Sequence, residues 1–380
     1  MVTVITLATA LLFAAERPAC SLAPLLASCH LASRLPVPRM EVALNTALGT
    51  TAGPPHRAGF VSIVGKPNVG KSTLMNAILG ERLSIITSKA QTTRHRIMGI
   101  MNGDDYQIVY SDTPGVLIPQ YKLQEGMMRF VQGSINDADI VVVVVDIFQD
   151  SSFDEKLLRQ LSSSTAALIV LLNKVDLLPS EAATGEEQGG TPTKSGGRTG
   201  GTSGAPRSRR VTRNALGSQA ELVARWEAEF DATVLPISAQ YGEGLDAVLA
   251  RIKALLPVHP PFYPKDQLSD KPERFFASEM MREAIFGHYQ QEIPYSCEVA
   301  VTSFKESDAL VEIACEIYVA ADSQKGIVIG KGGKALKAVG TKARERMESF
   351  FGKKVFLVTR VKVSKSWRND ELILASFGYL

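Results

Sequence analysis

The residues with the clearest chemical pattern lie between positions 65 and 73, where the sequence reads Gly-Lys-Pro-Asn-Val-Gly-Lys-Ser-Thr. This spacing matches G-x-x-x-x-G-K-[ST], a loop whose backbone N–H groups converge on phosphate oxygens. Lys71 adds positive charge for the β- and γ-phosphates, and the Ser72 hydroxyl is a ligand for Mg²⁺. The sequence therefore predicts a nucleoside-triphosphate site formed by Gly65, Lys66, Pro67, Asn68, Val69, Gly70, Lys71, Ser72 and Thr73.

A second group of residues, Asp112-Thr113-Pro114-Gly115-Val116, follows the apolar run 106–111. An aspartate at the end of a strand can hold Mg²⁺ through water, and the glycine N–H can meet a γ-phosphate. A D-T-P-G turn alone is a weak signal. Its place after the phosphate loop favours a nucleotide site over a glycine-rich turn that matches by chance.

Base recognition is predicted at two further strand ends. Asn173-Lys174-Val175-Asp176 follows the apolar run 167–172, and Ser238-Ala239 follows the run 233–237. The Asp176 carboxylate can accept both N1–H and N2–H of guanine, which adenine does not offer. A mismatched base would leave that charge unpaired. We expect a backbone N–H at Ser238-Ala239 to meet the guanine O6.

A loop of a different kind, Gly330-Lys331-Gly332-Gly333, lies near the C-terminus. KH domains hold single-stranded nucleic acid with a G-x-x-G loop between helices, because the glycines let the backbone approach phosphates. The alternative is a solvated basic helix with no ligand. The predicted order helix, strand, strand, G-x-x-G, helix, strand favours RNA binding by Gly330, Lys331, Gly332, Gly333, Lys334 and Lys337.

These loops must be positioned by helices and strands, and the chain of 380 residues is long enough for two domains. Residues 58–258 read as a P-loop α/β domain with a mostly parallel sheet and one antiparallel edge strand. Residues 259–271 read as a proline-rich, extended linker, and 272–380 as an α+β, type II KH domain. Residues 180–218 are rich in Gly, Ser and Thr and predict a disordered insertion. The basic residues of this insertion could contact RNA, but a solvated surface loop is the simpler interpretation.

The composition is that of a globular protein, with 45% hydrophobic residues, and a net charge of +3 says nothing about partners. The four cysteines form no C-x-x-C pair, so neither a zinc site nor a disulfide framework is indicated, and Cys297 and Cys315 are expected to be reduced and buried. No apolar stretch after residue 60 is long enough to span a bilayer.

Residues 1–57 have the composition of an organelle transit peptide. They carry Arg, Ser and Ala but only two acids, Glu16 and Glu41. A disordered tail is the alternative, and a two-part presequence with an apolar signal first also fits. Composition alone does not separate a plastid from a mitochondrion.

Together these motifs resemble the Era family of GTPases over residues 58–380, apart from the insertion. Lys89-Ala-Gln91-Thr-Thr93-Arg-His95-Arg is similar to the family's switch I. The stretches 273–279 and 292–295 are similar to the opening of its C-terminal domain, and 362–367 to its last strand and exit. Residues 260–266 are most similar to the plant and algal plastid branch, which favours the plastid.

The resemblance implies a GTP hydrolase that needs Mg²⁺, with Asn68, Lys71 and Thr93 as the expected catalytic residues. By motif position, Thr92 or Thr93 completes the Mg²⁺ ligands Ser72 and Asp112, and we expect Thr93 to do so. Val116 stands where many GTPases have a water-orienting Gln. Asn68 holds the position that ligates K⁺ in potassium-activated members. We therefore expect slow intrinsic hydrolysis, aided by K⁺ or by bound RNA.

The resemblance also implies partners and a location. The family's C-terminal domain binds the 3′ end of small-subunit ribosomal RNA, so this RNA and the pre-ribosomal particle are the expected partners. The expected location is the plastid stroma, with the mitochondrial matrix as the alternative. The family is associated peripherally with membranes, so we expect such a contact without a transmembrane segment. We also expect a monomer.

Three functions compete at this point. The first is a GTPase switch in plastid small-subunit assembly. The second is a nucleotide-stabilised RNA-binding adaptor with incidental GTP turnover, which Val116 motivates. The third, a tRNA-modification GTPase, is disfavoured by the KH pattern and by the absence of a C-terminal catalytic cysteine.

Overall fold

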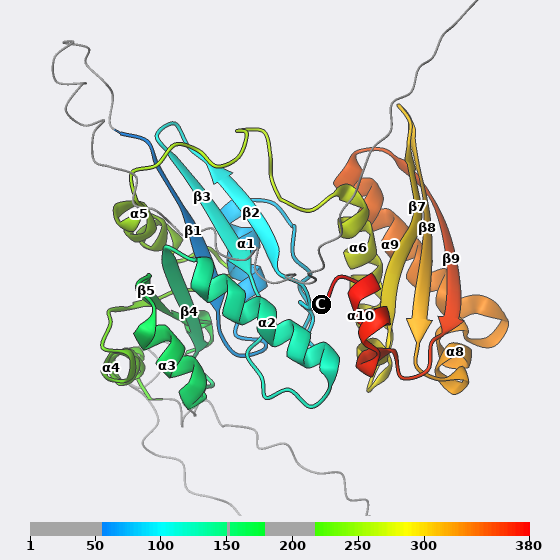
Figure 1. The fold of residues 1–380 in the computed structure, drawn as a ribbon, viewed down its shortest axis with the longest axis horizontal. Coiled ribbons are helices and arrows are strands. Elements are labelled where there is room, and N and C mark those ends of the chain that lie inside the picture. Colours follow the sequence, from blue (N-terminus) through cyan, green and yellow to red (C-terminus); the bar gives the residue numbers. More distant parts are fainter. Residues whose placement is uncertain (1–54, 150–152, 179–216) are drawn as a thin grey trace, which may run out of the picture. The chain divides into compact units, whose positions relative to one another are not determined.

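The structure, a computed structural model, describes residues 55–149, 153–178 and 217–380 (Figure 1). The predicted presequence and the predicted insertion lie outside the described residues, apart from their last few positions. Residues Pro54–Leu380 form one compact unit. The domain boundaries predicted at 58, 258 and 272 stay predictions.

The first domain contains a six-stranded sheet in the order β2-β3-β1-β4-β5-β6. All neighbouring strands pair in parallel except β2 and β3, which form an antiparallel hairpin at one edge. The predicted mostly parallel sheet with one antiparallel edge strand is therefore confirmed. The strands are β1 (Arg57–Val64), β2 (Ile97–Asn102), β3 (Tyr106–Asp112), β4 (Ile140–Asp146), β5 (Ala167–Asn173) and β6 (Val234–Pro236).

Helices cover both faces of this sheet, which is why its central strands are apolar on both sides. Every residue of β4 is buried, and its residues alternate between two apolar clusters. One cluster includes α1 (Lys71–Leu79) and α5 (Leu245–Leu255). The other includes α2 (Lys122–Asp137), α3 (Glu155–Ser163) and α4 (Gln219–Phe230).

Helices α2 and α4 are absent from the sequence predictions. In α2 the buried residues Leu123, Met127, Val131 and Ile135 recur every four positions, so the amphipathic signal is present. Two glycines within α2, Gly126 and Gly133, weaken its local helix propensity. Helix α4 begins at the edge of the undescribed segment, with Ser218 and Glu221 forming a capping box.

The linker between the domains runs along the antiparallel edge of the sheet. Ile100 N–H donates to Leu268 O at 2.9 Å, Asn102 Nδ2 to Lys265 O at 2.9 Å, and Gln107 Nε2 to Tyr263 O at 2.8 Å. An exposed edge strand presents unpaired backbone groups that can pair with other chains. Here the linker forms hydrogen bonds along that edge, beside β2. The predicted extended linker is thus tied to the first domain over part of its length.

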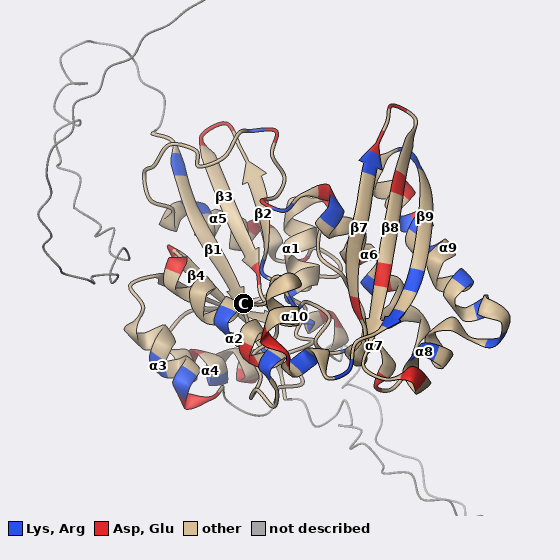
Figure 2. Cartoon of the chain, turned by 45° about the vertical axis from the view of Figure 1, so that its right-hand side comes forward, with Lys and Arg blue, Asp and Glu red and all other residues tan. Residues whose placement is uncertain are grey.

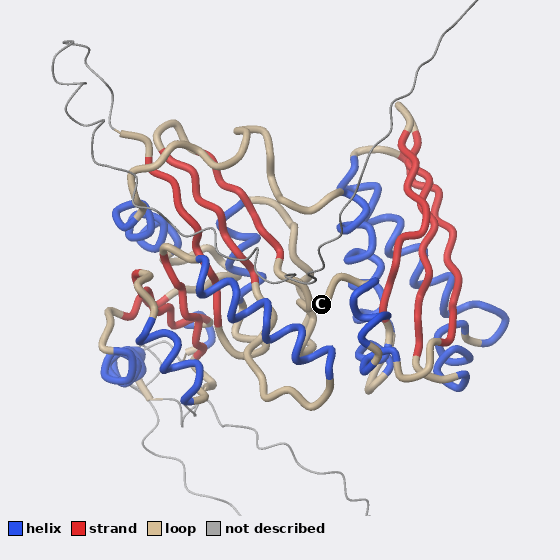
Figure 3. The backbone as a smooth tube through the Cα atoms, in the orientation of Figure 1, coloured by secondary structure: helices blue, strands red, loops and turns tan. Residues whose placement is uncertain are grey.

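The second domain contains a three-stranded sheet in the order β7-β8-β9, antiparallel and then parallel. Alternate residues of β8 are buried in one cluster with residues of α6 and α9, and Figure 3 shows these helices against one face of the sheet. This arrangement confirms the predicted KH domain. Its elements are α6 (Glu273–His288), α7 (Ile293–Ser296), β7 (Glu298–Glu306), β8 (Leu310–Val319), α8 (Asp322–Ile329), α9 (Lys334–Phe351), β9 (Lys354–Val363) and α10 (Glu371–Ser376).

Cys297 and Cys315 are free and buried, as predicted. Burial raises the pKa of each thiol to about 12. In the described part of the chain, no helix combines the length and the apolar character that crossing a membrane requires.

Candidate functional site

The loop between β1 and α1 brings its backbone into close contact with the loop after β5. Gly70 has a φ of +102°, and a Cβ there would lie 2.2 Å from Asn173 Nδ2, so only glycine fits. The Lys71 side chain is 6% exposed. Its Nζ donates to Gly65 O at 3.1 Å and to Lys66 O at 2.9 Å. Burial lowers the pKa of Lys71 to about 8, against the opposing charge of Asp112.

A cavity of about 500 Å³ opens over this loop. Ten of the predicted site residues line it: Pro67, Asn68, Gly70, Lys71, Ser72, Thr73, Thr92, Thr93, Gly115 and Lys174. Six further residues line it that were not among the predicted site residues: Ile85, Ile86, Thr87, Ser88, Gln91 and Gln240. A cavity of this size, lined by a lysine and by the residues at the N-terminus of α1, suits a phosphorylated ligand.

Three oxygen-bearing side chains meet beside Lys71. Ser72 Oγ donates to Asp112 Oδ2 at 2.6 Å and lies 3.0 Å from Thr93 Oγ1, which lies 3.4 Å from Asp112 Oδ2. Asp112 is fully buried, and its Oδ1 has no hydrogen-bond partner among the described residues. Burial raises the pKa of Asp112, against the hydrogen bond from Ser72 and the charge of Lys71. One oxygen of this buried carboxylate therefore has room in its bonding for a cation.

The two candidate threonines point to different places. Thr92 Oγ1 donates to Lys89 O at 2.8 Å and lies 2.8 Å from Thr87 Oγ1, so it faces its own loop. Only Thr93 joins Ser72 and Asp112. Across residues 55–149, 153–178 and 217–380 no group of three or more His, Cys, Asp or Glu side chains gathers as a metal site.

The segment after Asp112 crosses directly over the phosphate loop. A Cβ on Gly115 would lie 2.7 Å from Pro67 Cα, and the Val116 N–H donates to Gly65 O at 3.0 Å. The Val116 side chain packs on the apolar cluster around β4 and has no group that can orient water. Thr113, another predicted site residue, instead donates its hydroxyl proton to Ile63 O at 2.7 Å and so holds β3 to β1.

The two predicted base-recognition loops lie side by side. Asn173 Nδ2 donates to Val69 O at 2.7 Å, and Asn173 Oδ1 accepts from the Ala239 N–H at 2.9 Å. Ser238 Oγ donates to Asp176 Oδ1 at 2.6 Å. Of the two backbone N–H groups that could meet guanine O6, that of Ala239 is thus bonded to Asn173 in this structure, and that of Ser238 donates to Glu243 O at 3.1 Å. Its neighbour Gln240 lines the cavity.

Lys174 is held by Asp146, which was not among the predicted site residues. Its Nζ donates to Asn68 O at 2.7 Å and to Asp146 Oδ2 at 2.6 Å. Asp146 ends β4, so it lies at the same edge of the sheet as Asp112 and Asn173. A carboxylate at the C-terminal end of a central parallel strand was the signal available in the sequence.

The G-x-x-G loop in the second domain connects α8 to α9. Gly330, Gly332 and Gly333 have φ values of 71°, 61° and 75°, and a Cβ on Gly330 would lie 2.7 Å from Ala335 Cβ. The side chains of Lys331, Lys334 and Lys337 are exposed. Figure 2 shows basic residues along α9 and β9 and acidic residues on β8.

Two details of this domain were not expected. Ile327, one turn before the loop, is 52% exposed although it is apolar. Arg346 does not extend the basic face of α9, because its Nη2 donates to Arg82 O at 2.8 Å and its Nε lies 3.8 Å from Glu283. Arg346 therefore contacts the first domain and is not part of the exposed lysine surface beside the G-x-x-G loop.

Comparison with known proteins agrees with this geometry. Residues 60–174 match the family described as "50S ribosome-binding GTPase", and residues 292–368 match the KH domain family. The chain is 42% identical over 340 residues to "GTPase ERA1, chloroplastic" of Zea mays, covering 87% of this chain and 73% of the maize protein. The chain belongs to the Era family of GTPases.

Further relatives extend the likeness beyond plants and to solved structures. "GTPase Era" of Staphylococcus haemolyticus is 38% identical over 328 residues, covering 86% of this chain and 98% of the bacterial protein. A crystal structure of Era in complex with MgGDPNP and nucleotides 1506–1542 of 16S ribosomal RNA matches with a TM-score of 0.72 at 30% identity. It covers 85% of this chain and 99% of that one. The chain is thus an Era-family GTPase with a C-terminal KH domain.

Proposed function

We propose that this GTPase is a switch that binds small-subunit ribosomal RNA through its KH domain and assists assembly of the small ribosomal subunit in a plastid. The observation that carries the proposal is the presence of both sites in one compact unit, in a chain similar to an Era structure solved with MgGDPNP and 16S ribosomal RNA. The maize relative is named chloroplastic, which supports the plastid.

The nucleotide site supports the predicted roles of its residues. Mg²⁺ is commonly held by one or two carboxylates, hydroxyls and substrate phosphates. Ser72, Thr93 and Asp112 are such a set, and the unpartnered Asp112 Oδ1 fits a nearby cation. When bound, the ion neutralises charge that develops on the phosphates. Lys71 binds the phosphates, and Asp176 accepts from the guanine base.

The hydrolysis step is proposed to be slow without help. Val116 stands at the position of a water-orienting Gln and has no polar group that could orient the attacking water. Asn68 Nδ2 donates to Ser88 O at 3.3 Å, so Asn68 joins the phosphate loop to the segment that carries Thr93. A K⁺ ion on the Asn68 oxygen would add positive charge beside the phosphates, where it stabilises the transition state.

The KH domain is proposed to hold the RNA at Gly330, Lys331, Gly332 and Gly333, with Lys334 and Lys337 beside them. Its glycine backbone and three exposed lysines suit phosphates, and the exposed Ile327 suits an unstacked base. The Lys331→Glu substitution should weaken binding of a 3′-terminal small-subunit RNA fragment. Lys156→Glu, the same charge change on the exposed side of α3, is the control.

The decisive experiment measures GTP turnover by the purified chain in KCl or NaCl, with and without this RNA. We expect K⁺ or RNA to raise kcat several-fold and Lys71→Ala to abolish GTP binding. Crosslinking of plastid RNA should differ between the GTP-analogue and GDP states. If neither K⁺ nor RNA changes turnover and crosslinking is the same in both states, the nucleotide-stabilised adaptor is the better description.

A further inference from the structure

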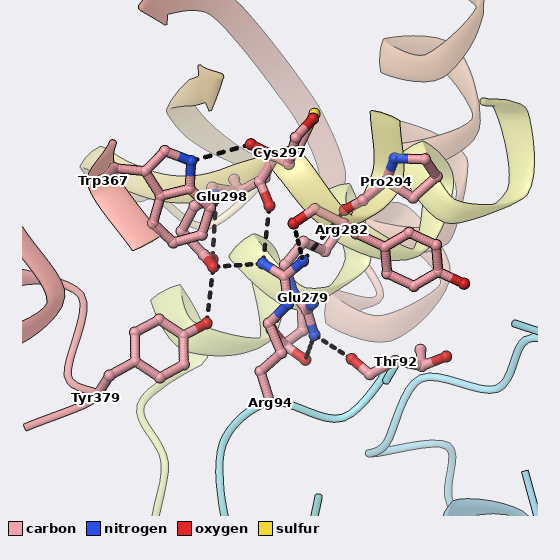
Figure 4. A network of polar contacts seen from close by, with 12 residues as sticks. Thr92, Arg94, Glu279, Arg282, Pro294, Cys297, Glu298, Trp367 and Tyr379 are labelled. Atoms are coloured by element: carbon pink, nitrogen blue, oxygen red, sulfur yellow. Dashed lines mark hydrogen bonds and ion pairs between the residues drawn. The ribbon is translucent and has the colours of Figure 1, made fainter. Parts of the chain in front are cut away.

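The segment that carries Thr93 is held from outside by residues of the KH domain. Arg94 follows Thr93 and is 2% exposed. Its Nη1 donates to Glu298 Oε2 and to Cys297 O, each at 2.8 Å, and its Nη2 donates to Pro294 O and Tyr295 O at 3.2 Å (Figure 4). The guanidinium is thus placed by carbonyls and a carboxylate of one region of the KH domain.

The other end of the same segment has KH partners too. Arg282 of α6, itself held by Glu279 at 2.8 Å, donates to Thr92 O. Lys89 Nζ donates to Phe286 O at 2.6 Å and also to Tyr289 O. Thr93 therefore lies in a short stretch that is anchored to the KH domain at Lys89, Thr92 and Arg94.

The end of the chain completes this arrangement. The residues after 368 lie beyond the matched KH region. Among them, Tyr379 donates its hydroxyl proton to Glu298 Oε2 at 2.7 Å and stacks on His95 with ring centroids 4.2 Å apart. Its carbonyl oxygen would lie 2.7 Å from a Cβ on Gly126 of α2. Tyr379 thus touches both the segment after Thr93 and the helix that follows Asp112–Val116 in the chain.

The contact between Arg94 and Glu298 is a buried ion pair. Burial would raise the pKa of Glu298, but Arg94 and Arg282 hold it below its usual value, so the carboxylate stays charged. Breaking one partner of a buried pair leaves the other charge without compensation. By contrast, Thr93 is joined to Ser72 and Asp112 by hydroxyl contacts alone.

We propose that Glu298 and Tyr379 are positioning residues for GTP hydrolysis, holding Thr93 beside Ser72 and Asp112 through Arg94 and His95. The KH domain then contributes to the GTP-bound form of the nucleotide site without touching the nucleotide. Because switch segments are ordered by the γ-phosphate and its Mg²⁺, the effect falls on GTP and not on GDP. The proposal rests on the family's GTPase activity and does not require RNA.

The test uses the full chain with Glu298→Gln and Tyr379→Phe, which keep side-chain shape and remove a charge or a hydroxyl. Glu306→Gln is the matched control, because it removes a carboxylate from the same strand, β7, at a site exposed to solvent. We measure Kd for GDP and for the non-hydrolysable analogue GDPNP with Mg²⁺, and kcat for GTP. Melting curves report folding.

We expect Glu298→Gln to weaken GDPNP binding and lower kcat, each about tenfold, while Kd for GDP changes less than about twofold. Tyr379→Phe should show the same pattern at smaller size. The control should match the parent. The proposal is overturned if both variants fold and keep the parent's preference for GDPNP over GDP. It is equally overturned if both nucleotides weaken by the same factor, which would indicate a general loss of structure. Should Glu298→Gln fail to fold, Tyr379→Phe decides alone.

Discussion

Single residues in the nucleotide site are placed by partners far away in the sequence. Lys174 is an example, because Asn68 O and the Asp146 carboxylate fix its ammonium at 2.7 and 2.6 Å. The Asp146 side chain is 11% exposed and that of Lys174 is 28% exposed. The pair is therefore partly shielded from solvent, and we expect its loss to weaken the position of the base-recognition loop that carries Lys174.

Asp146→Asn should release nucleotide faster. The substitution keeps the side-chain shape but removes the charge that holds Lys174, so we expect the GDP dissociation rate to rise about fivefold, or about 1 kcal/mol. Stopped-flow release of a fluorescent GDP measures it. Glu155→Gln breaks the exposed pair with Arg159 in the same domain and should leave the rate unchanged. An unchanged rate in Asp146→Asn would contradict the role given to this residue.

Residues within a local motif can be proposed from the sequence, whereas residues that act across the fold cannot. Lys71 and Ser72 follow from spacing alone, because a phosphate loop brings its own backbone to the ligand. Asp112 follows from its place at a strand end after that loop. Asp146, Gln240 and the partners of Arg94 depend on which strand ends and loops meet in the folded chain. For Asp146 its place at a strand end was a signal, but for Gln240 and the partners of Arg94 no spacing rule contains that information.

At the scale of elements, the apolar runs determined most of the predictions. A wholly buried strand such as β4 is visible as an unbroken run of β-branched residues. Helix α2 was not predicted although its buried residues recur every four positions, and Gly126 and Gly133 lower the helix propensity of this stretch. The linker was predicted as extended, but its bonds to β2 and β3 are tertiary contacts that composition does not reveal.

Gly115→Ala tests the crossing of two such elements. Its Cβ would lie 2.7 Å from Pro67 Cα, so the phosphate loop or the segment after β3 must shift. We expect GTP-analogue binding to weaken at least about tenfold, or 1.4 kcal/mol, with little change in melting temperature. Titration calorimetry and thermal unfolding measure the two effects.

Gly133→Ala is the matched control for this substitution. It lies in α2, and nothing is within 4 Å of its added Cβ. It should stabilise the helix by about 0.5–1 kcal/mol and leave nucleotide binding unchanged. Equal binding by Gly115→Ala and the parent would show that the two segments have room to separate.

On the scale of the whole molecule, His95 connects the domains and makes stability depend on pH. It stacks on Tyr379 and lies against Phe275, with Glu279, Glu298, Arg282 and Lys271 facing it. Burial lowers the pKa of His95 to about 4, although the two glutamates oppose the shift. The folded chain thus keeps this ring neutral in a range where an unfolded chain protonates it.

The sign of the effect follows from proton binding. The unfolded state takes up a proton below its pKa of 6.5, whereas the folded state does so only near pH 4. The stability that neutral His95 contributes is therefore fully present above about pH 6.5 and is lost as the pH falls toward 4. Urea unfolding at pH 7.5, 6.0 and 5.0 should show a smaller decline for His95→Gln than for the parent. Parallel declines would exclude His95 as a source of the pH dependence.

The two buried thiols lie at different places in the second domain. Cys315 is in the middle of β8, whereas the carbonyl of Cys297 accepts the Arg94 guanidinium from the first domain. With a pKa of about 12, each is almost entirely in the thiol form near neutral pH, which alkylating reagents attack poorly. Parting of the domains removes the arginine that covers the Cys297 backbone but leaves the β8 ladder intact. We expect Cys297 to be labelled before Cys315 when the domains separate, and both thiols to be labelled together when the second domain unfolds, so that the order of labelling is a chemical probe of that motion.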